Sequence, residues 1–533
     1  MRPPSLPTQT ALLIQAIALL IVLAWWAARG VSYSLDAPAG LPAEALFRAP
    51  QMLPCVSYSP FRHQDINPFN PQARVTPAQI EADLRILKTR TNCIRTYGLS
   101  QGLDAVPGVV QKLEMRMKLG VWLARDEVQN RQELARGIAL AHQFKDVIDL
   151  LVVGNEVLLR RELSPEALGR ILAEAKQISP VPVSYADVWE FWLRHAPLAE
   201  HVNVVTVHIL PYWEDNPVAV HDAVKHVDTI ASGVQQHFAV TPVWVGETGW
   251  PAAGRQRAGA VPGKIEQNRF VNELLARKSL LDYNLIEGFD QPWKRSFEGA
   301  MGGYWGLFDQ FGHPRVAFSG NVTEDEQWWR GPVGAVVGGL LALSSLAAVR
   351  VRTWSWVLAG ALLGALAPLQ WLMMQQWDRS PREQALSALL GATSAAVTLI
   401  TLLPKRNEFA RIARDFLLFA ASTAALVLLL DARYRPFPWW WFLAPTVTIL
   451  AWRVGDADSV NTFKTSDEAR LLAAVLAICA GLVALTEGGR NFQALSYCCL
   501  LIVLAGAAGW PRGVFRIKTS RANSAAGAQS SVV

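Results

Sequence analysis

The stretch from Val243 to Pro251 constrains the fold of this 533-residue chain more than any other segment. It opens with apolar residues in the pattern of a strand buried on both faces, and it places Glu247 where the apolar run ends. Gly249 and Pro251 end the strand, and Trp250 adds a flat apolar ring. A carboxylate and an aromatic ring at the carboxyl end of a parallel strand are typical of a barrel that cleaves sugars, although Glu247 alone could also be a solvated turn residue.

A second run repeats this pattern nearer the N-terminus. Residues 150–153 are apolar, and Asn155 and Glu156 follow soon after them. Glu156 and Glu247 are 247 − 156 = 91 residues apart, which leaves room for about three strand–helix units between them. In an eight-stranded barrel, we therefore expect the two carboxylates to face one cleft from opposite walls.

Strand-like runs and helical stretches alternate through this part of the chain. Thr76 followed by Pro77, and Ser164 followed by Pro165, are typical helix starts. The alternation predicts the α/β class and a (β/α)8 TIM barrel over residues 51–320. The expected strands are residues 55–58, 93–97, 119–123, 150–156, 181–185, 204–210, 243–247 and 284–289.

Aromatic side chains follow many of these strands. Each one alone is more typical of core packing, but so many at one barrel rim favour sugar binding, because sugar rings present C–H faces that stack on aromatic rings. We expect sugar contacts from Tyr97, Trp122, Tyr185, Tyr212, Trp213, Trp250 and Trp293, with Trp189 and Trp192 as further acceptor-binding candidates. No dinucleotide fingerprint, Walker A motif or zinc-ligand spacing occurs, so we expect no cofactor and no metal.

Long apolar runs lie on both sides of the barrel sequence and raise the mean hydropathy to +0.19. Residues 11–28 can span a bilayer, and we expect an uncleaved anchor within residues 1–30 rather than a signal peptide. A linker is expected at 31–50, a seven-helix transmembrane region at 331–510 and a disordered cytoplasmic tail at 511–533. The seven expected spans are 331–349, 353–373, 383–403, 413–430, 437–452, 469–486 and 493–510, the fifth being short.

Lys and Arg predict the orientation of these spans. Arg350, Arg352, Lys405, Arg406 and Lys464 fall in alternate connections, and more basic residues follow the last span. The positive-inside rule then places both chain ends in the cytoplasm and residues 31–330 on the other side of the membrane. We attribute much of the net charge of +6 to this topology, so we expect membrane lipid and no nucleic acid as a partner.

The five cysteines divide into two groups. Cys479, Cys498 and Cys499 lie in apolar spans and are expected to be packing residues. Cys55 and Cys93 lie near the first two expected strands, where a disulfide is one alternative, but we favour two buried thiols.

Taken together, these motifs resemble glycoside hydrolase family 17, the β-1,3-glucanases and β-1,3-glucan transglycosylases. The resemblance covers roughly residues 52–316. It rests on the segments 94–97, 153–156, 246–251 and 289–294, followed by Glu298 and residues 305–308. Gln291 departs from the pattern, because many members have an acidic residue there, which puts one sugar contact in doubt.

The resemblance implies a retaining double displacement with Glu247 as nucleophile and Glu156 as acid/base. It places Asn155 at the sugar 2-hydroxyl and gives the proton donor a raised pKa. We expect Tyr97 and His208 to orient the nucleophile. The remaining expected substrate-binding residues are Asp187, Asp290, Lys294 and Glu298, with Lys294 as a solvated rim charge being the alternative.

The apolar spans resemble those of bacterial membrane-bound members linked to periplasmic or cyclic β-glucan synthesis. They imply the bacterial inner membrane with a periplasmic catalytic domain, a β-glucan substrate and a candidate glucan synthase partner. We favour transfer to a glucan acceptor over hydrolysis, and the spans, which hold almost no internal charge, are read as an anchor or docking platform. A non-catalytic glucan-binding or assembly protein is the remaining alternative.

Overall fold

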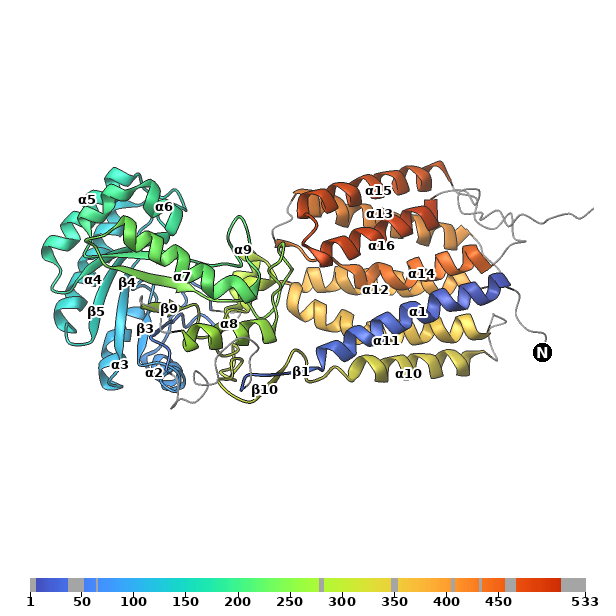
Figure 1. Ribbon diagram of the computed structural model, residues 1–533, viewed down its shortest axis with the longest axis horizontal. Coiled ribbons are helices and arrows are strands. Elements are labelled where there is room, and N and C mark those ends of the chain that lie inside the picture. The colour runs from blue at the N-terminus through green and yellow to red at the C-terminus, as the bar shows by residue number, and fades with distance from the viewer. Residues whose placement is uncertain are drawn as a thin grey trace, which may run out of the picture.

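The computed structural model describes residues 6–36, 52–63, 66–277, 282–346, 353–403, 408–430, 434–455 and 466–509. It consists of a barrel domain and a helical bundle lying end to end (Figure 1). The predicted tail at 511–533, residues 37–50 of the predicted linker, and Arg350, Arg352, Lys405, Arg406 and Lys464 lie outside the described residues.

Eight parallel strands close into the predicted barrel, so the expected fold class is confirmed. All eight expected strands are present, although the strands predicted at 93–97, 204–210 and 284–289 end earlier than expected. In chain order the strands are β2 Cys55–Ser57, β3 Cys93–Arg95, β4 Arg116–Val121, β5 Ile148–Asn155, β6 Val183–Val188, β7 Val204–His208, β8 Val243–Thr248 and β9 Tyr283–Leu285.

Helices cover the outside of the barrel. Thr76 accepts a hydrogen bond from the Gln79 N–H and Ser164 from the Ala167 N–H, so both predicted caps start helices as expected. Apolar side chains between strands and helices form one large core. The helices are α2 Pro77–Leu87, α3 Val106–Lys112, α4 Glu127–Gln143, α5 Pro165–Ile178, α6 Trp189–Arg194, α7 Val220–His237, α8 Lys264–Ala276 and α9 Arg295–Glu298.

The barrel interior changes from apolar to polar along the strands. Cys55, Cys93 and Trp244 belong to a small apolar cluster separate from the outer core. Side chains two residues further along a strand point to the same face, so Ser57 and Arg95 form a polar layer above it. This layer lies at the carboxyl ends of the strands, where barrel enzymes place their active sites.

Cys55 and Cys93 form a disulfide, so the expectation of two free thiols was wrong. The two residues begin adjacent parallel strands, and their side chains share the barrel interior, with Cα atoms 4.5 Å apart. This separation is within the range that a disulfide needs. The spacing of the two cysteines in the sequence does not reveal that their strands are adjacent in the barrel.

Part of the predicted linker is structured. Strand β1, Ser32–Ser34, pairs antiparallel with β10, Asn321–Thr323, which follows the barrel. The chain therefore leaves the first apolar helix and later enters the bundle through one small sheet. Arg29 strengthens this joint with ion pairs to Glu324 and Asp325.

The apolar runs form one bundle of helices. By length and composition, six of the described helices could cross a membrane, namely α1, α11, α12, α13, α15 and α16. The described part of α10 and the short α14 fall below that length. The helices are α1 Leu6–Arg29, α10 Arg330–Ser345, α11 Thr353–Trp377, α12 Pro381–Leu402, α13 Glu408–Leu430, α14 Trp439–Gly455, α15 Asp467–Glu487 and α16 Phe492–Gly509.

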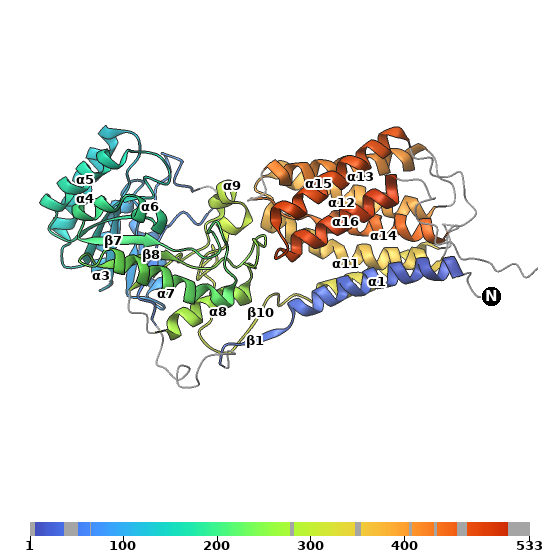
Figure 2. The same cartoon turned by 45° about the horizontal axis from the view of Figure 1, so that its top comes forward.

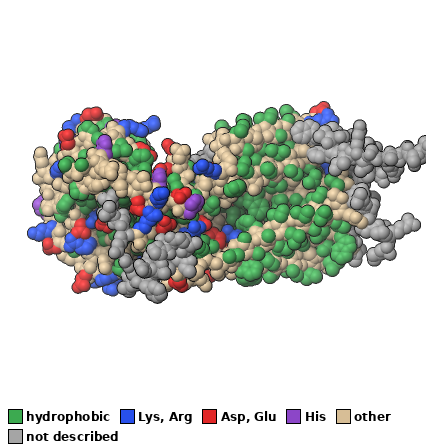
Figure 3. Space-filling view, viewed as in Figure 1, with side chains coloured by type: hydrophobic (Ala, Val, Ile, Leu, Met, Phe, Trp, Pro, Cys, Tyr) green, Lys and Arg blue, Asp and Glu red, His purple; other side chains and the backbone are tan. Residues whose placement is uncertain are grey.

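Hydrophobic side chains cover the face of the bundle that Figure 3 shows, in contrast to the mixed surface of the barrel. Leu20, Leu341 and Leu485 are examples, with exposed fractions of 63%, 65% and 80%. Inside the bundle, a Cβ added at Gly338 of α10 would lie 2.2 Å from the Gly360 carbonyl oxygen of α11. Such close backbone contact through small residues is typical of helices that pack within lipid.

Candidate active site

Glu156 and Glu247 come together at the carboxyl ends of the barrel strands. Glu247 is the fifth residue of β8, and Glu156 follows β5 directly. Carboxylate oxygens of the two residues and a ring nitrogen of His208 all lie within 4.8 Å of one another. The expectation that these carboxylates share one site therefore agrees with the geometry.

The backbone turns sharply to present Glu156. Its φ of +52° lies in the left-handed region, which non-glycine residues seldom adopt and which costs free energy. The Glu156 N–H donates to the Ala186 carbonyl at 2.7 Å, and the Leu158 N–H donates to the Tyr185 hydroxyl at 3.1 Å. These bonds from β6 hold the turn in place.

His208, at the end of β7, lies between the two carboxylates. Its Nδ1 is 2.9 Å from Glu156 Oε1, and its Nε2 is 3.6 Å from Glu247 Oε1. The ring is 1% exposed. Arg95 Nη1 lies 3.2 Å from Nε2, and because a guanidinium can only donate, this contact assigns the ring proton to Nδ1, which donates to Glu156.

Arg95, at the end of β3, is the residue that ties the site together. Its Nη1 lies 2.7 Å from the Gly246 carbonyl oxygen and 3.1 Å from Glu247 Oε1, and its Nη2 donates to Asn155 Oδ1 at 2.5 Å. Arg95 lies within the segment 94–97 that carries the family resemblance, but its role was not predicted from the sequence. The usable signal was a charged residue two positions after Cys93, on a strand expected to be buried.

Three residues in this cluster, Glu156, His208 and Glu247, are of the types that bind metal ions. Arg95 already brings a positive charge to Glu247, and a cation placed there would be repelled by it. His208 directs both ring nitrogens at groups within the network. The contacts of this donor set are thus accounted for by the protein's own side chains.

The pKa of Glu156 is shifted in the direction opposite to the one expected for a proton donor. Burial raises the pKa. The hydrogen bond from His208 and the positive charges of Arg95 and Arg160 together lower it by more, so the net pKa lies below its usual value. A sugar bound beside Glu156 would exclude water and strengthen the effect of burial. The lowered pKa describes the site without substrate.

A second charged cluster lies beside the first. Lys294 Nζ is 2.9 Å from both carboxylate oxygens of Glu287, which is 1% exposed. Burial raises the pKa of Glu287 to about 7, although Lys294 opposes the shift. Burial also raises the pKa of Glu298, and so do the charges of Glu156 and Glu247. Lys294 is therefore not a solvated rim charge. Glu287 was not predicted as a site residue, although it is an acidic residue inside the strand expected at 284–289.

Four of the aromatic residues predicted to contact sugar keep exposed or half-exposed rings, namely Tyr97, Trp122, Trp213 and Trp293. Tyr97 donates to or accepts from Ser57 at 2.7 Å, and the Arg160 guanidinium lies 4.1 Å from the centre of the Trp122 ring. These four residues are available to a ligand at the rim.

Other predicted contacts are buried, and the structure contradicts a direct role for them. The Tyr212 hydroxyl donates to the Arg255 carbonyl, Trp250 Nε1 donates to the Val261 carbonyl, and Tyr185 bonds Asp187. A side chain enclosed by protein offers no surface to a sugar, so these residues support the loops that carry the site. The residues concerned are Tyr185, Asp187, Tyr212, Trp250 and Asp290, with exposed fractions of 0% to 3%, and the acceptor candidate Trp192, at 1%.

Asp290 and Gln291 have structural partners. Asp290 pairs with Arg315 at 2.6 Å and accepts from the Gly306 N–H, and burial raises its pKa to about 7. Gln291 is fully buried, donates to the Ser59 carbonyl and accepts from Trp293 Nε1 at 2.9 Å. Its departure from the family pattern therefore affects the support of Trp293 and not a sugar contact of its own.

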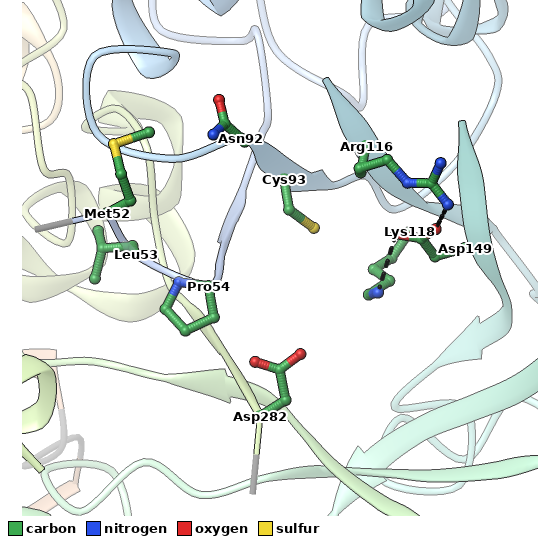
Figure 4. Close-up of a pocket in the computed structure, with 9 residues that line it drawn as sticks. All are labelled: Met52, Leu53, Pro54, Asn92, Cys93, Arg116, Lys118, Asp149 and Asp282. Atoms are coloured by element: carbon green, nitrogen blue, oxygen red, sulfur yellow. Dashed lines mark hydrogen bonds and ion pairs between the residues drawn. The ribbon is translucent and has the colours of Figure 1, made fainter. Parts of the chain in front are cut away.

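A cavity of about 370 Å³ lies at the opposite end of the barrel (Figure 4). Arg116, Lys118 and Asp149 line it, together with Cys93 of the disulfide. Arg116 and Lys118 both pair with Asp149. In barrels of this type, residues at this end serve stability, so the cavity is separate from the candidate site.

Residues 55–306 match the family model described as the BtgE/BtgC glycoside hydrolase domain. A probable glucan endo-1,3-beta-glucosidase of Aspergillus fumigatus, btgC, is 25% identical over 298 residues, covering 49% of this chain and 42% of its own length. Glucan 1,3-beta-glucosidase BGL2 of Candida albicans is 25% identical over 257 residues, covering 43% of this chain and 82% of its own. This chain thus spans about two fifths of the length of the first of these relatives.

Among solved structures, the glycoside hydrolase family 17 β-1,3-glucanosyltransferase of Rhizomucor miehei is similar to the barrel domain. It is 23% identical, and the match covers 51% of this chain and 99% of that chain with a TM-score of 0.44.

Proposed function

We propose, from the premise that residues 55–306 belong to glycoside hydrolase family 17, that this protein is a membrane-anchored, retaining β-1,3-glucan transglycosylase. One observation supports the chemistry most directly. Carboxylate oxygens of Glu156 and Glu247 lie within 4.8 Å of each other. Retaining glycosidases hold their two carboxyl groups about 5–5.5 Å apart, whereas inverting enzymes leave room for a water between them.

In the first step, Glu247 attacks the anomeric carbon while Glu156 donates its proton to the glycosidic oxygen. The bond between that carbon and the leaving oxygen breaks, and an ester between the sugar and Glu247 forms. Arg95 Nη1 lies 3.1 Å from Glu247 Oε1 and brings a positive charge to the carboxylate that attacks. Arg95 donates a hydrogen bond to Asn155 Oδ1, and we propose that the Asn155 side chain bonds the sugar 2-hydroxyl.

In the second step, Glu156 removes a proton from an acceptor hydroxyl, whose oxygen attacks the anomeric carbon and releases Glu247. A glucan hydroxyl as acceptor gives a transglycosylase, and water gives a hydrolase. The half-exposed rings of Trp213 and Trp293 favour a sugar acceptor, because they can hold a second glucan next to the site.

The helical bundle supports a location at a membrane. Six described helices are long and apolar enough to cross one, and apolar side chains cover the visible bundle face. We place the barrel on the periplasmic side of a bacterial inner membrane, where a glucan synthase would supply nascent chains. Processing of a growing glucan at the bilayer gives such a bundle a purpose that a freely secreted glucanase would lack.

The test is to incubate the purified full-length protein with laminari-oligosaccharides of one defined length. We expect products both longer and shorter than the substrate, and the proportion of longer products should increase with substrate concentration. Glu247→Gln and Glu156→Gln should each abolish both kinds of product. Shorter products alone at every concentration would establish the hydrolase instead, and activity in both variants would reject the assigned roles.

A further inference from the structure

The bundle contacts the face of the barrel that carries the candidate site. Loops that follow β7, β8 and β9 lie against the bundle at the α11–α12, α13–α14 and α15–α16 connections and the helix ends beside them, as the views in Figures 1 and 2 agree. Charged and histidine side chains gather where the two parts meet (Figure 3). The site is therefore next to the helix ends and does not face away from the bundle.

The loop after β8 is fixed by the start of α16. Gln256 is 3% exposed, and its side-chain amide donates to the Arg490 carbonyl at 2.9 Å. Its backbone N–H donates to Gln493 Oε1 at 3.0 Å, and its carbonyl accepts from Asn491 Nδ2 at 3.0 Å. Four directional bonds to one residue, counting the Gln493 N–H that donates to Gln256 Oε1, hold this loop in one conformation.

A buried ion pair adds to this attachment. Arg255 is 3% exposed, pairs with Glu487 at the end of α15, and lies with its guanidinium carbon 4.4 Å from the centre of the Phe437 ring. A charge enclosed in this way is costly without its partner. The loop after β8 begins two residues past Glu247 and is thus anchored to the bundle as well as to the barrel.

Tyr434, in the α13–α14 connection, contacts two loops at the carboxyl end of the barrel. Its ring centre is 6.1 Å from that of Trp213, in the edge-on geometry of aromatic pairs. Its backbone packs on Gly299, where an added Cβ would meet the Tyr434 carbonyl oxygen at 2.5 Å. Trp213 follows β7 and Gly299 follows β9, so Tyr434 bridges the loops on either side of β8.

Gly299 directly follows Glu298, whose charge interacts with those of Glu156 and Glu247. Tyr434 therefore lies across the end of the strand that carries Glu247, beside a tryptophan available to sugar. Its ring is half-exposed. A flat, half-exposed ring in this position can stack on a glucan chain that leaves the site toward the bundle.

We infer that the helical bundle completes the glucan-binding site, with Tyr434 contributing a sugar contact next to Trp213. This inference rests on the proposed function, since it names a contact for the same substrate. The bundle is then part of the enzyme, and glucan runs between the barrel and the helix ends. The Tyr434 ring comes from the connection between α13 and α14, outside residues 55–306 of the matched domain.

The test compares Tyr434→Leu and Tyr434→Phe in the full-length protein, using laminari-oligosaccharides. The leucine keeps an apolar side chain at the joint but lacks the flat ring, and we expect it to raise KM by about five-fold with kcat nearly unchanged, the effect of losing one stacking contact. The phenylalanine keeps the ring and should behave as the wild type. Trp329→Ala, which removes an exposed ring from the start of α10, is the matched control and should leave KM unchanged.

An unchanged KM in Tyr434→Leu would overturn the inference. So would a fall in kcat or Tm at constant KM, since a purely structural contact predicts that result. If the wild type itself processes no β-1,3-glucan, the proposed function fails first, and this outcome is distinct from an active wild type with an insensitive Tyr434.

Discussion

Arg95 and His208 determine, at the scale of single residues, how two carboxylates can share one small site. Two like charges this close would repel, and one would take up a proton. Arg95 compensates Glu247, while His208 donates to Glu156, so each carboxylate has its own partner. The different partners give the two groups different environments, as an acid and a nucleophile require.

The contact between His208 and Glu156 predicts a pH effect. His208→Gln removes the hydrogen bond that does most to lower the pKa of Glu156, so that pKa should rise. The protonated donor is lost as pH rises through its pKa, and the alkaline limb of kcat/KM should therefore move to higher pH. The pH profile of kcat/KM measures this, with His313→Gln at an exposed histidine as control. A limb that stays in place or moves to lower pH would show that Glu156 is not the donor.

The pair of Lys294 and Glu287 predicts an effect on stability. Lys294→Met leaves Glu287, 1% exposed, without its partner, and losing one member of a buried pair costs about 3–5 kcal/mol. Adding Glu287→Gln should recover part of the loss, because the amide carries no charge. Thermal unfolding of the full-length protein measures both variants. Lys112→Met at an exposed pair is the control, and an equal Tm in all variants would contradict the burial argument.

At residue level, the sequence predicted that two carboxylates would lie close together, and it misjudged the burial of several aromatic side chains. Glu156 and Glu247 were found because each ends an apolar run, and the structure brings them together. Tyr212 and Trp250 share that position at a strand end but turn inward. The two-residue period of a strand predicts which side of the sheet a side chain points to, but it does not predict the direction of a side chain in the loop that follows the strand. Arg95 was passed over because a charge inside a buried strand gains its partners only from distant strands.

At the scale of elements, the strands and helices of the barrel follow local rules, and the predicted family resemblance is confirmed over residues 55–306. Apolar runs predicted the strands, and the N-cap residues Thr76 and Ser164 predicted where two helices begin. Ladder irregularities escaped prediction. Pairing shifts register between Val207 and His208 and between Val152 and Asn155, close to the site, where bulges redirect side chains.

The disulfide between Cys55 and Cys93 predicts a stability loss when it is removed. The bond closes a loop of 38 residues and joins the first two barrel strands, and such bonds contribute about 2–4 kcal/mol. Cys55→Ala with Cys93→Ala should therefore lower the Tm of the barrel while glucan processing persists at low temperature, since the bond lies at the other end of the barrel. Cys499→Ala, at an exposed free thiol, is the control. Equal Tm values with and without reductant would show that the bond does not form.

At the scale of the whole molecule, the barrel rests on one end of the bundle only. The connections α11–α12, α13–α14 and α15–α16 all contact it, through Arg379, Tyr434 and Arg490. Arg29 and the small β1–β10 sheet join the same end. This arrangement matches the topology expected from the basic residues, in which these three connections and the barrel share one side. The sequence could not show that the barrel would turn its site toward these connections, since that depends on contacts between residues from 80 to 237 positions apart.

The shared side can be tested with single cysteines in a Cys499→Ser background. Gly489→Cys lies in the α15–α16 connection, and Val454→Cys lies at the other end of the bundle with an exposed fraction of 37% for the native side chain. A membrane-impermeant thiol reagent applied to cells whose outer membrane alone is permeabilised should label Gly489→Cys, together with Arg131→Cys on the exposed surface of α4. Val454→Cys should react only after detergent opens the inner membrane, because a charged reagent cannot cross the hydrocarbon core. Labelling of Val454→Cys in intact membranes, with Gly489→Cys protected, would place the barrel in the cytoplasm and remove the access to periplasmic glucan on which its proposed activity depends.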